Sequence, residues 1–193
     1  MRDQFKVDMK NLISIILFFT ISVSLLNAQS KDSLNNPSTD FFEQKIGKYV
    51  GLPAPLFEAP DLDGTKHYLD AYEDYIVVLH FWQVFSDPST SQIPSLNKIV
   101  EEYFDRGVVV FGFATNDVED LTNFKKEQKV NYPLIPNSMQ FSKDYYGGEM
   151  GYPRVFLIDK YGIVQKVLVG GKPGDFMDLY NDLVPFIEEH LKY

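Results

Sequence analysis

The stretch that decides the fold is residues 75–104, YIVVLHFWQVFSDPSTSQIPSLNKIVEEYF. It opens with a continuous apolar run from Tyr75 to Trp82, rich in β-branched and aromatic residues, which is typical of a strand buried on both faces. A helix start follows this run. Ser86 or Asp87 can accept a hydrogen bond from a free first-turn N–H, and Pro88 suits a position that needs no donor.

The rest of this stretch has helical spacing, because its apolar residues fall on one helical face: Ile93, Leu96, Ile99, Val100 and Phe104. A buried strand therefore runs directly into a helix. The helix begins at the carboxyl end of the strand, which is where chemistry usually occurs in open α/β sheets.

The remainder of the chain predicts further α/β units. Residues 108–114 form a second continuous apolar run, and Asn116 or Asp117 can cap a helix over roughly 118–129. A short edge segment is expected over 132–135, a helix over 138–146, a strand over 163–169 and a last helix over about 174–190. Before the central strand, residues 61–64 (DLDG) predict a hairpin turn. Strands alternating with helices favour a central sheet covered by helices.

The segment FWQVFSDPSTSQIPSLNKIVEEY also resembles the active-site segment of the thioredoxin-like TlpA/ResA group in the AhpC/TSA (redoxin) superfamily. In that family a strand ends in Phe-Trp, a Trp-Cys-x-x-Cys motif follows, and the helix contains Glu-x-Pro. Phe81, Trp82, Pro88 and Pro94 match this pattern, and Phe85 takes the place of the second Trp.

The reactive residues of that pattern are replaced. Ser86 and Ser89 stand at the positions of the two cysteines, and Gln92 stands where many members have Glu. The chain contains no cysteine at all, which excludes disulfides, thiolate metal sites and mechanisms that start from a Cys nucleophile. No catalytic residue, cofactor or metal site is therefore predicted, and the simplest role for both serines is helix capping.

A second segment, GYPRVFLIDKYG at residues 151–162, resembles the family's Gly-x-Pro-x-x-Phe-Leu-Ile-Asp-x-x-Gly. In the family this proline is cis and lies against the active-site helix. The resemblance implies that the backbone of Tyr152, before Pro153, faces a groove in which a substrate segment pairs like an added strand. It also implies a thioredoxin-like α/β fold over residues 49–193, with a central mixed β-sheet flanked by helices and an N-terminal β-hairpin extension.

A hydrolytic role for Ser86 would require a neighbouring base and a group that orients this base. His80 lies on the buried strand and is expected to be a satisfied core residue. His67 falls on the peripheral hairpin and His190 at the end of the last helix. The three histidines are scattered and predict no metal site.

Composition and the N-terminal residues predict where the protein acts. The net charge of −9 argues against binding to nucleic acid or to an anionic membrane. Residues 1–28 are predicted to include a secretory signal, with Lys10 before an apolar run from 12 to 26 and Ala28 at the cut, so the membrane is met only before cleavage. Residues 29–48 are expected to be a linker or N-terminal extension, and the product to be periplasmic or extracellular.

These observations favour an exported, non-redox protein that binds a peptide or protein partner in the groove beside Pro153. The partner-binding residues would be Phe85, Ser86, Asp87, Tyr152 and Pro153. Two alternatives remain. One is oxidoreductase or antioxidant activity of the AhpC/TSA type by an unidentified centre, and the other is a structural role in the cell envelope with a vestigial groove.

Overall fold

The computed structural model describes residues 37–174 and 176–192. The predicted secretory signal and residues 29–36 of the predicted linker lie outside this range. Within the remaining residues of the predicted linker or N-terminal extension, helix α2 spans Pro37–Ile46. Pro37 is its first residue, a position at which the missing N–H of proline costs nothing. The fold below is that of residues 42–192, which form one structural unit.

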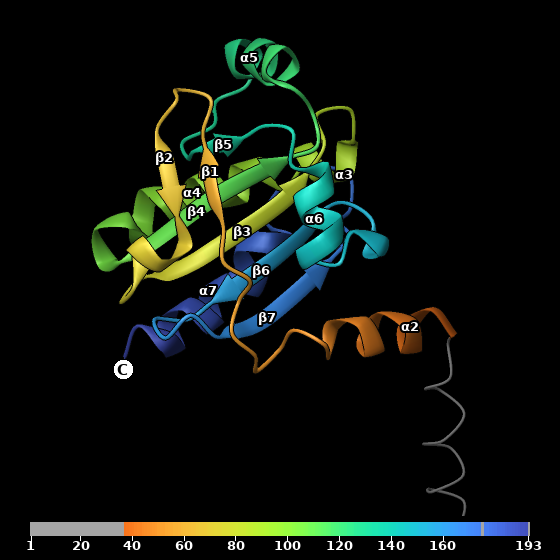
Figure 1. Cartoon of the computed structure of the whole chain (residues 1–193), viewed down its shortest axis with the longest axis vertical. Coiled ribbons are helices and arrows are strands. Elements are labelled where there is room, and N and C mark those ends of the chain that lie inside the picture. Colours follow the sequence, from red (N-terminus) through yellow and green to blue (C-terminus); the bar gives the residue numbers. More distant parts are fainter. Residues whose placement is uncertain (1–36, 175, 193) are drawn as a thin grey trace, which may run out of the picture. The chain divides into compact units, whose positions relative to one another are not determined.

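A five-stranded mixed sheet lies at the centre, in the order β5-β4-β3-β6-β7 (Figure 1). Strands β3 (Ile76–Trp82), β4 (Val108–Ala114) and β5 (Leu134–Ile135) run parallel. Strand β6 (Arg154–Ile158) is antiparallel to β3, and β7 (Val164–Val169) is antiparallel to β6. Every residue of β3 and β4 is buried, as the unbroken apolar runs predict.

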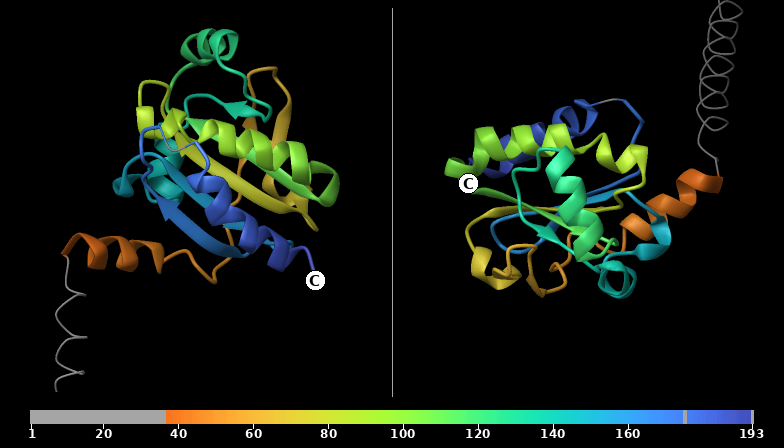
Figure 2. Two further views of the ribbon diagram at one scale, coloured as in Figure 1. Left: turned by 180° about the vertical axis from the view of Figure 1, so that it is seen from behind. Right: turned by 90° about the horizontal axis from the view of Figure 1, so that it is seen from above.

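Each face of the sheet carries its own hydrophobic core. On one face, helices α4 (Ile93–Tyr103) and α7 (Asp178–His190) lie side by side and cover Ile76, Val78 and Trp82 (Figure 2). The opposite core contains Val77, Leu79 and Phe81 together with residues of the hairpin and of α6 (Met139–Tyr145). The alternation follows from the period of two along a strand. Phe81 and Trp82 are fully buried, as expected for core residues.

The predicted hairpin is present as β1 (Glu58–Pro60) paired with β2 (Lys66–Tyr68). In its turn, Asp61 Oδ1 accepts hydrogen bonds of 2.9 Å from the N–H groups of Asp63 and Thr65. Helix α5 (Val118–Glu127) is capped by Asp117, whose carboxylate accepts from Asp120 N–H at 2.9 Å. Three short 3-10 helices complete the described elements: η1 (Leu69–Tyr72), η2 (Phe104–Arg106) and η3 (Gly148–Met150).

The helix predicted after the central strand is divided in two. A single turn, α3, spans Asp87–Thr90, and α4 begins at Ile93. Pro94 explains the break, because it has no N–H to donate to the carbonyl of Thr90 and its ring crowds that carbonyl.

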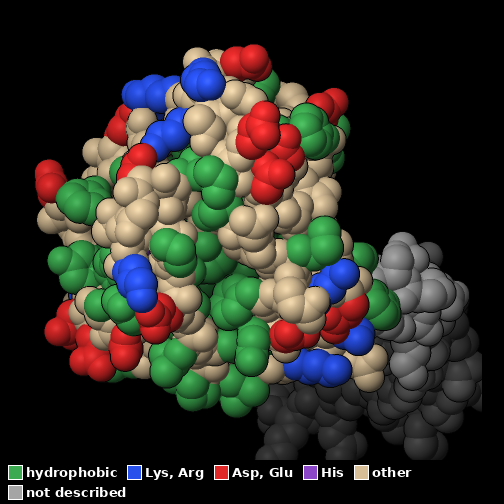
Figure 3. All heavy atoms as spheres, turned by 45° about the horizontal axis from the view of Figure 1, so that its top comes forward, with side chains coloured by type: hydrophobic (Ala, Val, Ile, Leu, Met, Phe, Trp, Pro, Cys, Tyr) green, Lys and Arg blue, Asp and Glu red, His purple; other side chains and the backbone are tan. Residues whose placement is uncertain are grey.

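On the face of the molecule shown in Figure 3, hydrophobic side chains gather in a hollowed central area, with charged side chains mainly around it. Within the described part of the chain, no helix has the length and apolar character that crossing a bilayer requires. The apolar run at residues 12–26 lies outside that part.

Candidate functional site

Ser86 lies at the N-terminus of α3, but its hydroxyl does not cap the helix. Its backbone carbonyl oxygen instead accepts hydrogen bonds from the N–H groups of Ser89 at 2.9 Å and Thr90 at 3.0 Å. The Asp87 side chain is exposed and has no described hydrogen bond to a first-turn N–H. The capping predicted for Ser86 is therefore wrong: backbone groups hold the turn, and the Ser86 hydroxyl makes no capping hydrogen bond within the described part of the chain.

Ser89 is fully buried, and its Oγ has no hydrogen-bond partner among the described residues. It lies inside the single turn of α3 rather than at its end, so the capping role expected for this residue is also wrong. A buried hydroxyl without a partner loses its hydration and gains nothing in return. Position 89 is thus shaped to hold a small side chain below the surface, and a polar group there is not required for the fold.

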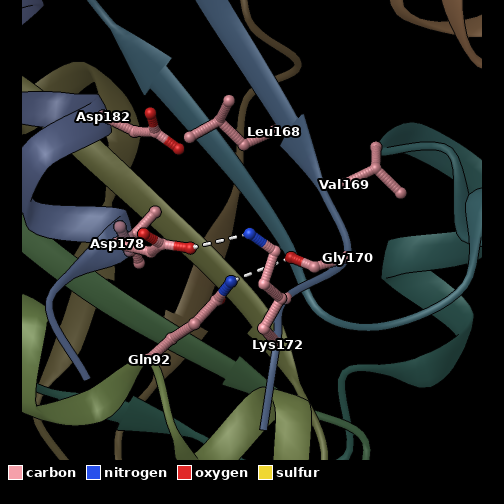
Figure 4. A pocket seen from close by; sticks show the side chains of 9 residues that line it. Gln92, Leu168, Val169, Gly170, Lys172, Asp178 and Asp182 are labelled. Atoms are coloured by element: carbon pink, nitrogen blue, oxygen red, sulfur yellow. Dashed lines mark hydrogen bonds and ion pairs between the residues drawn. The ribbon is translucent and has the colours of Figure 1, made fainter. Parts of the chain in front are cut away.

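Gln92 joins the start of α4 to the end of β7. Its Nε2 donates a hydrogen bond of 2.9 Å to the carbonyl oxygen of Gly170 (Figure 4). The adjoining pocket has a volume of about 310 Å³ and includes an ion pair of 3.5 Å between Lys172 and Asp178. Gln92 Oε1 is buried without a partner in the described part of the chain. The role of Gln92 is to hold two elements together.

His80 is fully buried on β3, with its ring stacked on that of Trp82 at 5.8 Å between centroids. Burial lowers the pKa of His80 to about 3, and the nearby Gln92 side chain opposes this shift. No hydrogen bond of normal geometry joins the two, and neither ring nitrogen has a partner among the described residues. His80 is thus a core residue as predicted, but it is not satisfied, and it is neutral at physiological pH.

The turn of α3 and the loop at Pro153 are connected through Gly171. A side chain at position 171 would meet Gln92 Nε2 at 2.9 Å and the Pro88 carbonyl oxygen at 3.0 Å, with Pro153 Cγ at 3.5 Å. The absence of a Cβ permits this approach. The peptide bond between Tyr152 and Pro153 is cis. The two sequence segments singled out by their motifs therefore meet in space.

The side chain of Tyr152 is already engaged inside the protein. Its hydroxyl donates to Ser142 Oγ at 3.1 Å, and the Arg154 guanidinium lies 4.5 Å from the ring centroid. Arg154 is itself fully buried and also donates to the Tyr146 carbonyl at 3.1 Å. Tyr152 is half-buried, so its backbone rather than its ring remains a candidate contact for a partner.

Phe85 is 82% exposed and borders a pocket with a volume of about 640 Å³. Asp87 also borders this pocket, whereas Ser86, Tyr152 and Pro153 do not. Other walls come from α3 and α4, from α5 through Phe124, and from the segment after β7 through Phe176. The predicted partner-binding residues therefore divide between this aromatic pocket and the Pro153 loop.

The contribution of Phe176 could not be predicted from the order of residues in the chain. Ser95 Oγ donates to the Phe176 carbonyl oxygen at 2.6 Å, and Ser91 Oγ accepts from Gly174 N–H at 3.0 Å. These two bonds hold the segment after β7 against the start of α4. Ser91 and Ser95 lie on either side of the break between α3 and α4, so their spacing carries no helical signal for this contact.

Sheet order, flanking helices and the strand–turn–helix site define a protein of the thioredoxin-like fold whose active-site motif contains no thiol. The AhpC/TSA family model matches residues 50–167, and the chain belongs to this family. It is 29% identical over 133 residues to the thiol-disulfide oxidoreductase ResA of Geobacillus thermodenitrificans, which covers 68% of this chain and 75% of that protein. The thioredoxin-like protein YneN of Bacillus subtilis is 26% identical, covering 67% and 77%.

A solved structure shows the same similarity. The thioredoxin domain of a thiol-disulfide oxidoreductase from Bacteroides vulgatus superposes with a TM-score of 0.59 at 25% identity, covering 72% of this chain and 97% of that one. The expected relationship to ResA-type proteins is thus confirmed, together with the thioredoxin-like fold.

Proposed function

We propose that this protein is an exported, non-redox member of the AhpC/TSA family that binds an extended peptide or a protein segment beside α3. The observation that carries the proposal is the aromatic pocket at Phe85, next to a motif that has lost both thiols. Exposed aromatic side chains around a preformed hollow are typical binding anchors.

The contacts of the pocket explain how a partner would be held. Phe85 and Phe176, which is 54% exposed, offer apolar area, and Asp87 offers a charge at the margin. The bonds from Ser91 and Ser95 fix the segment that carries Phe176, so little conformational entropy is lost on binding. Beyond the pocket, the side chain of Tyr152 is engaged inside the protein, so its backbone is the part that would contact a partner.

The names of the relatives favour a second function, a thiol-disulfide oxidoreductase. A serine hydroxyl cannot form a mixed disulfide, so this function would need a centre other than Ser86 and Ser89. The fully buried, neutral His80 cannot provide one, because its ring nitrogens are out of reach of a substrate.

A peptide selection tests the binding function. A random linear peptide library displayed on phage is selected against the purified protein, and the dissociation constant of a selected peptide is measured by calorimetry. Phe85→Ala and Phe176→Ala are expected to weaken binding about tenfold, because each removes an anchor. Tyr161→Ala, which removes a side chain that is 80% exposed elsewhere, is the matched control. Failure to select any peptide, or equal binding by all variants, would contradict the proposal.

Export is supported by the residues at 9–28. Mass spectrometry of the protein recovered from its native cells is expected to show a chain that starts at Gln29. A chain that retains residues 9–28 in a soluble cell fraction would contradict this part of the proposal.

A further inference from the structure

A second pocket lies at the outer edge of β4, away from the motif residues. Strand β5 pairs with β4 only at Gly112 and Phe113, so among the described residues no strand lies beside the first half of β4 on this edge. A pocket of about 340 Å³ occupies the space. It lies between the hairpin side of the sheet, through Tyr72 and Tyr75, and the helix side, through Phe104.

The hydrogen-bond pattern determines which backbone groups face this pocket. Gly112 N–H donates toward β5, to the Pro133 carbonyl oxygen at 2.9 Å, whereas Thr115 N–H donates toward β3, to the Trp82 carbonyl oxygen at 3.1 Å. Backbone groups alternate between the two edges of a strand. Val110 therefore directs both its N–H and its C=O to the open edge, and neither has a hydrogen-bond partner in the described part of the chain.

Two features of the neighbouring segment keep this edge open. The next donor along the β5 ladder would be residue 133, which is a proline and has no N–H. The residues before it are held on α4 instead. Asn97 Oδ1 accepts from Asn131 N–H at 2.8 Å, and Asn97 Nδ2 donates to the Lys129 carbonyl oxygen at 2.8 Å.

The walls of the pocket are aromatic and rigid. Tyr72 is fixed by a hydrogen bond of 2.9 Å between its hydroxyl and His67 Nδ1, and His67 Nε2 pairs with Asp61 Oδ2 at 2.9 Å. Tyr72 and Tyr75 meet edge to face at 6.0 Å between centroids. The residues that line the pocket include no Lys, Arg, Asp or Glu, which favours an uncharged ligand.

Size decides between a peptide strand and a small molecule. Val110 is only 2% exposed, so a strand lying along the surface could not reach its backbone groups. A ligand that enters the pocket could reach these backbone groups. The volume of the pocket is at the lower end of the range for small-molecule sites, ~300–1,000 Å³. An amide that carries its N–H and C=O on one side complements the donor and acceptor of a single extended residue.

We propose that this pocket binds small, uncharged aromatic molecules that carry a primary or cis amide, with the amide on the backbone of Val110 and the ring among Tyr72, Tyr75 and Phe104. The site shares no lining residue with the pocket at Phe85. This proposal can therefore be tested independently of the peptide-binding function.

The test is a titration of the ¹⁵N-labelled protein with benzamide, followed by the amide signals in NMR spectra. The Val110 amide is expected to shift, and its hydrogen exchange to slow as benzamide saturates the site. N,N-dimethylbenzamide keeps the ring and the carbonyl but has no N–H, and it is expected to bind about tenfold more weakly. Benzoate, which carries a charge, is expected to bind more weakly still.

A pair of variants locates the ring. Phe104→Ala removes a side chain that is 58% exposed at the mouth of the pocket and is expected to weaken benzamide binding about threefold. Tyr161→Ala, which removes a side chain that is 80% exposed and does not line this pocket, is expected to leave benzamide binding unchanged. An unmoved Val110 signal, equal binding of the two benzamides, or equal effects of the two variants would overturn the proposal.

Discussion

Gln92 Nε2 donates a hydrogen bond of 2.9 Å to the carbonyl oxygen of Gly170, seventy-eight residues further along the chain. This contact fixes the start of α4 to the end of β7, and Gly171 lies directly against the same amide. The position of the motif relative to the sheet therefore depends on a neutral side chain that can donate. A carboxylate at this position could not make the bond unless protonated.

Gln92→Glu is accordingly expected to destabilise the fold at neutral pH. The change replaces the donor by a buried carboxylate facing a carbonyl oxygen, at a cost of about 1–3 kcal/mol in the free energy of unfolding. Urea unfolding measures it, with the exposed Gln44→Glu as the matched control. Equal midpoints for the two variants would show that the Gly170 contact contributes nothing.

His80 predicts a specific dependence of stability on pH. Its pKa in the folded protein is about 3, against an ordinary value of 6.5, because burial penalises the charged form. Below pH 6.5 the unfolded chain binds a proton at His80 and the folded chain does not, so this contribution lowers stability as the pH falls from about 6.5 toward 3. Between pH 7 and pH 5 the loss amounts to about 2 kcal/mol.

Urea unfolding at pH 7 and pH 5 checks this prediction with His80→Leu as the comparison. The variant lacks the titrating ring but keeps an apolar side chain, so it is expected to lose about 2 kcal/mol less than the parent between the two pH values. His67 and His190 are present in both proteins, and their effects cancel in the difference. An identical loss of stability in parent and variant would mean that His80 can bind a proton in the folded protein, which would contradict the prediction.

Ser89→Ala distinguishes two roles for Ser89: the helix capping predicted from sequence, and the buried hydroxyl without a described partner that the structure shows. If Ser89 capped the helix, its removal would cost about 1 kcal/mol. Since Ser89 Oγ is buried without a described partner, the change is instead expected to leave the free energy of unfolding equal or raise it by up to about 1 kcal/mol. Thermal and urea unfolding report the sign. A clear loss of stability would mean that the hydroxyl has a partner.

The fold could be predicted from sequence because its strongest patterns concern burial. The apolar runs at 76–82 and 108–114 and the turn at Asp61 each depend on neighbours close in the chain. The break between α3 and α4 was missed, although Pro94 offered the signal, because the apolar spacing continues across it.

The site could be predicted only in part, because its walls come from distant segments. The sequence indicated Phe85 and the loop at Pro153, but it could not show that Tyr152 turns inward to Ser142. Phe176 lines the same pocket as Phe85, on a segment that hydrogen bonds to Ser91 and Ser95 hold in place. Such long-range contacts have no periodic signature in the chain.

The most direct test of the central claim, that the family's scaffold persists without its thiol chemistry, is an insulin-reduction assay in dithiothreitol. The unsubstituted protein is expected to reduce insulin no faster than buffer. A Ser86→Cys, Ser89→Cys double variant is expected to accelerate the reaction, because it places two sulfurs at the positions that the resemblance to the Trp-Cys-x-x-Cys motif implies. Acceleration by the unsubstituted, cysteine-free protein would contradict the account.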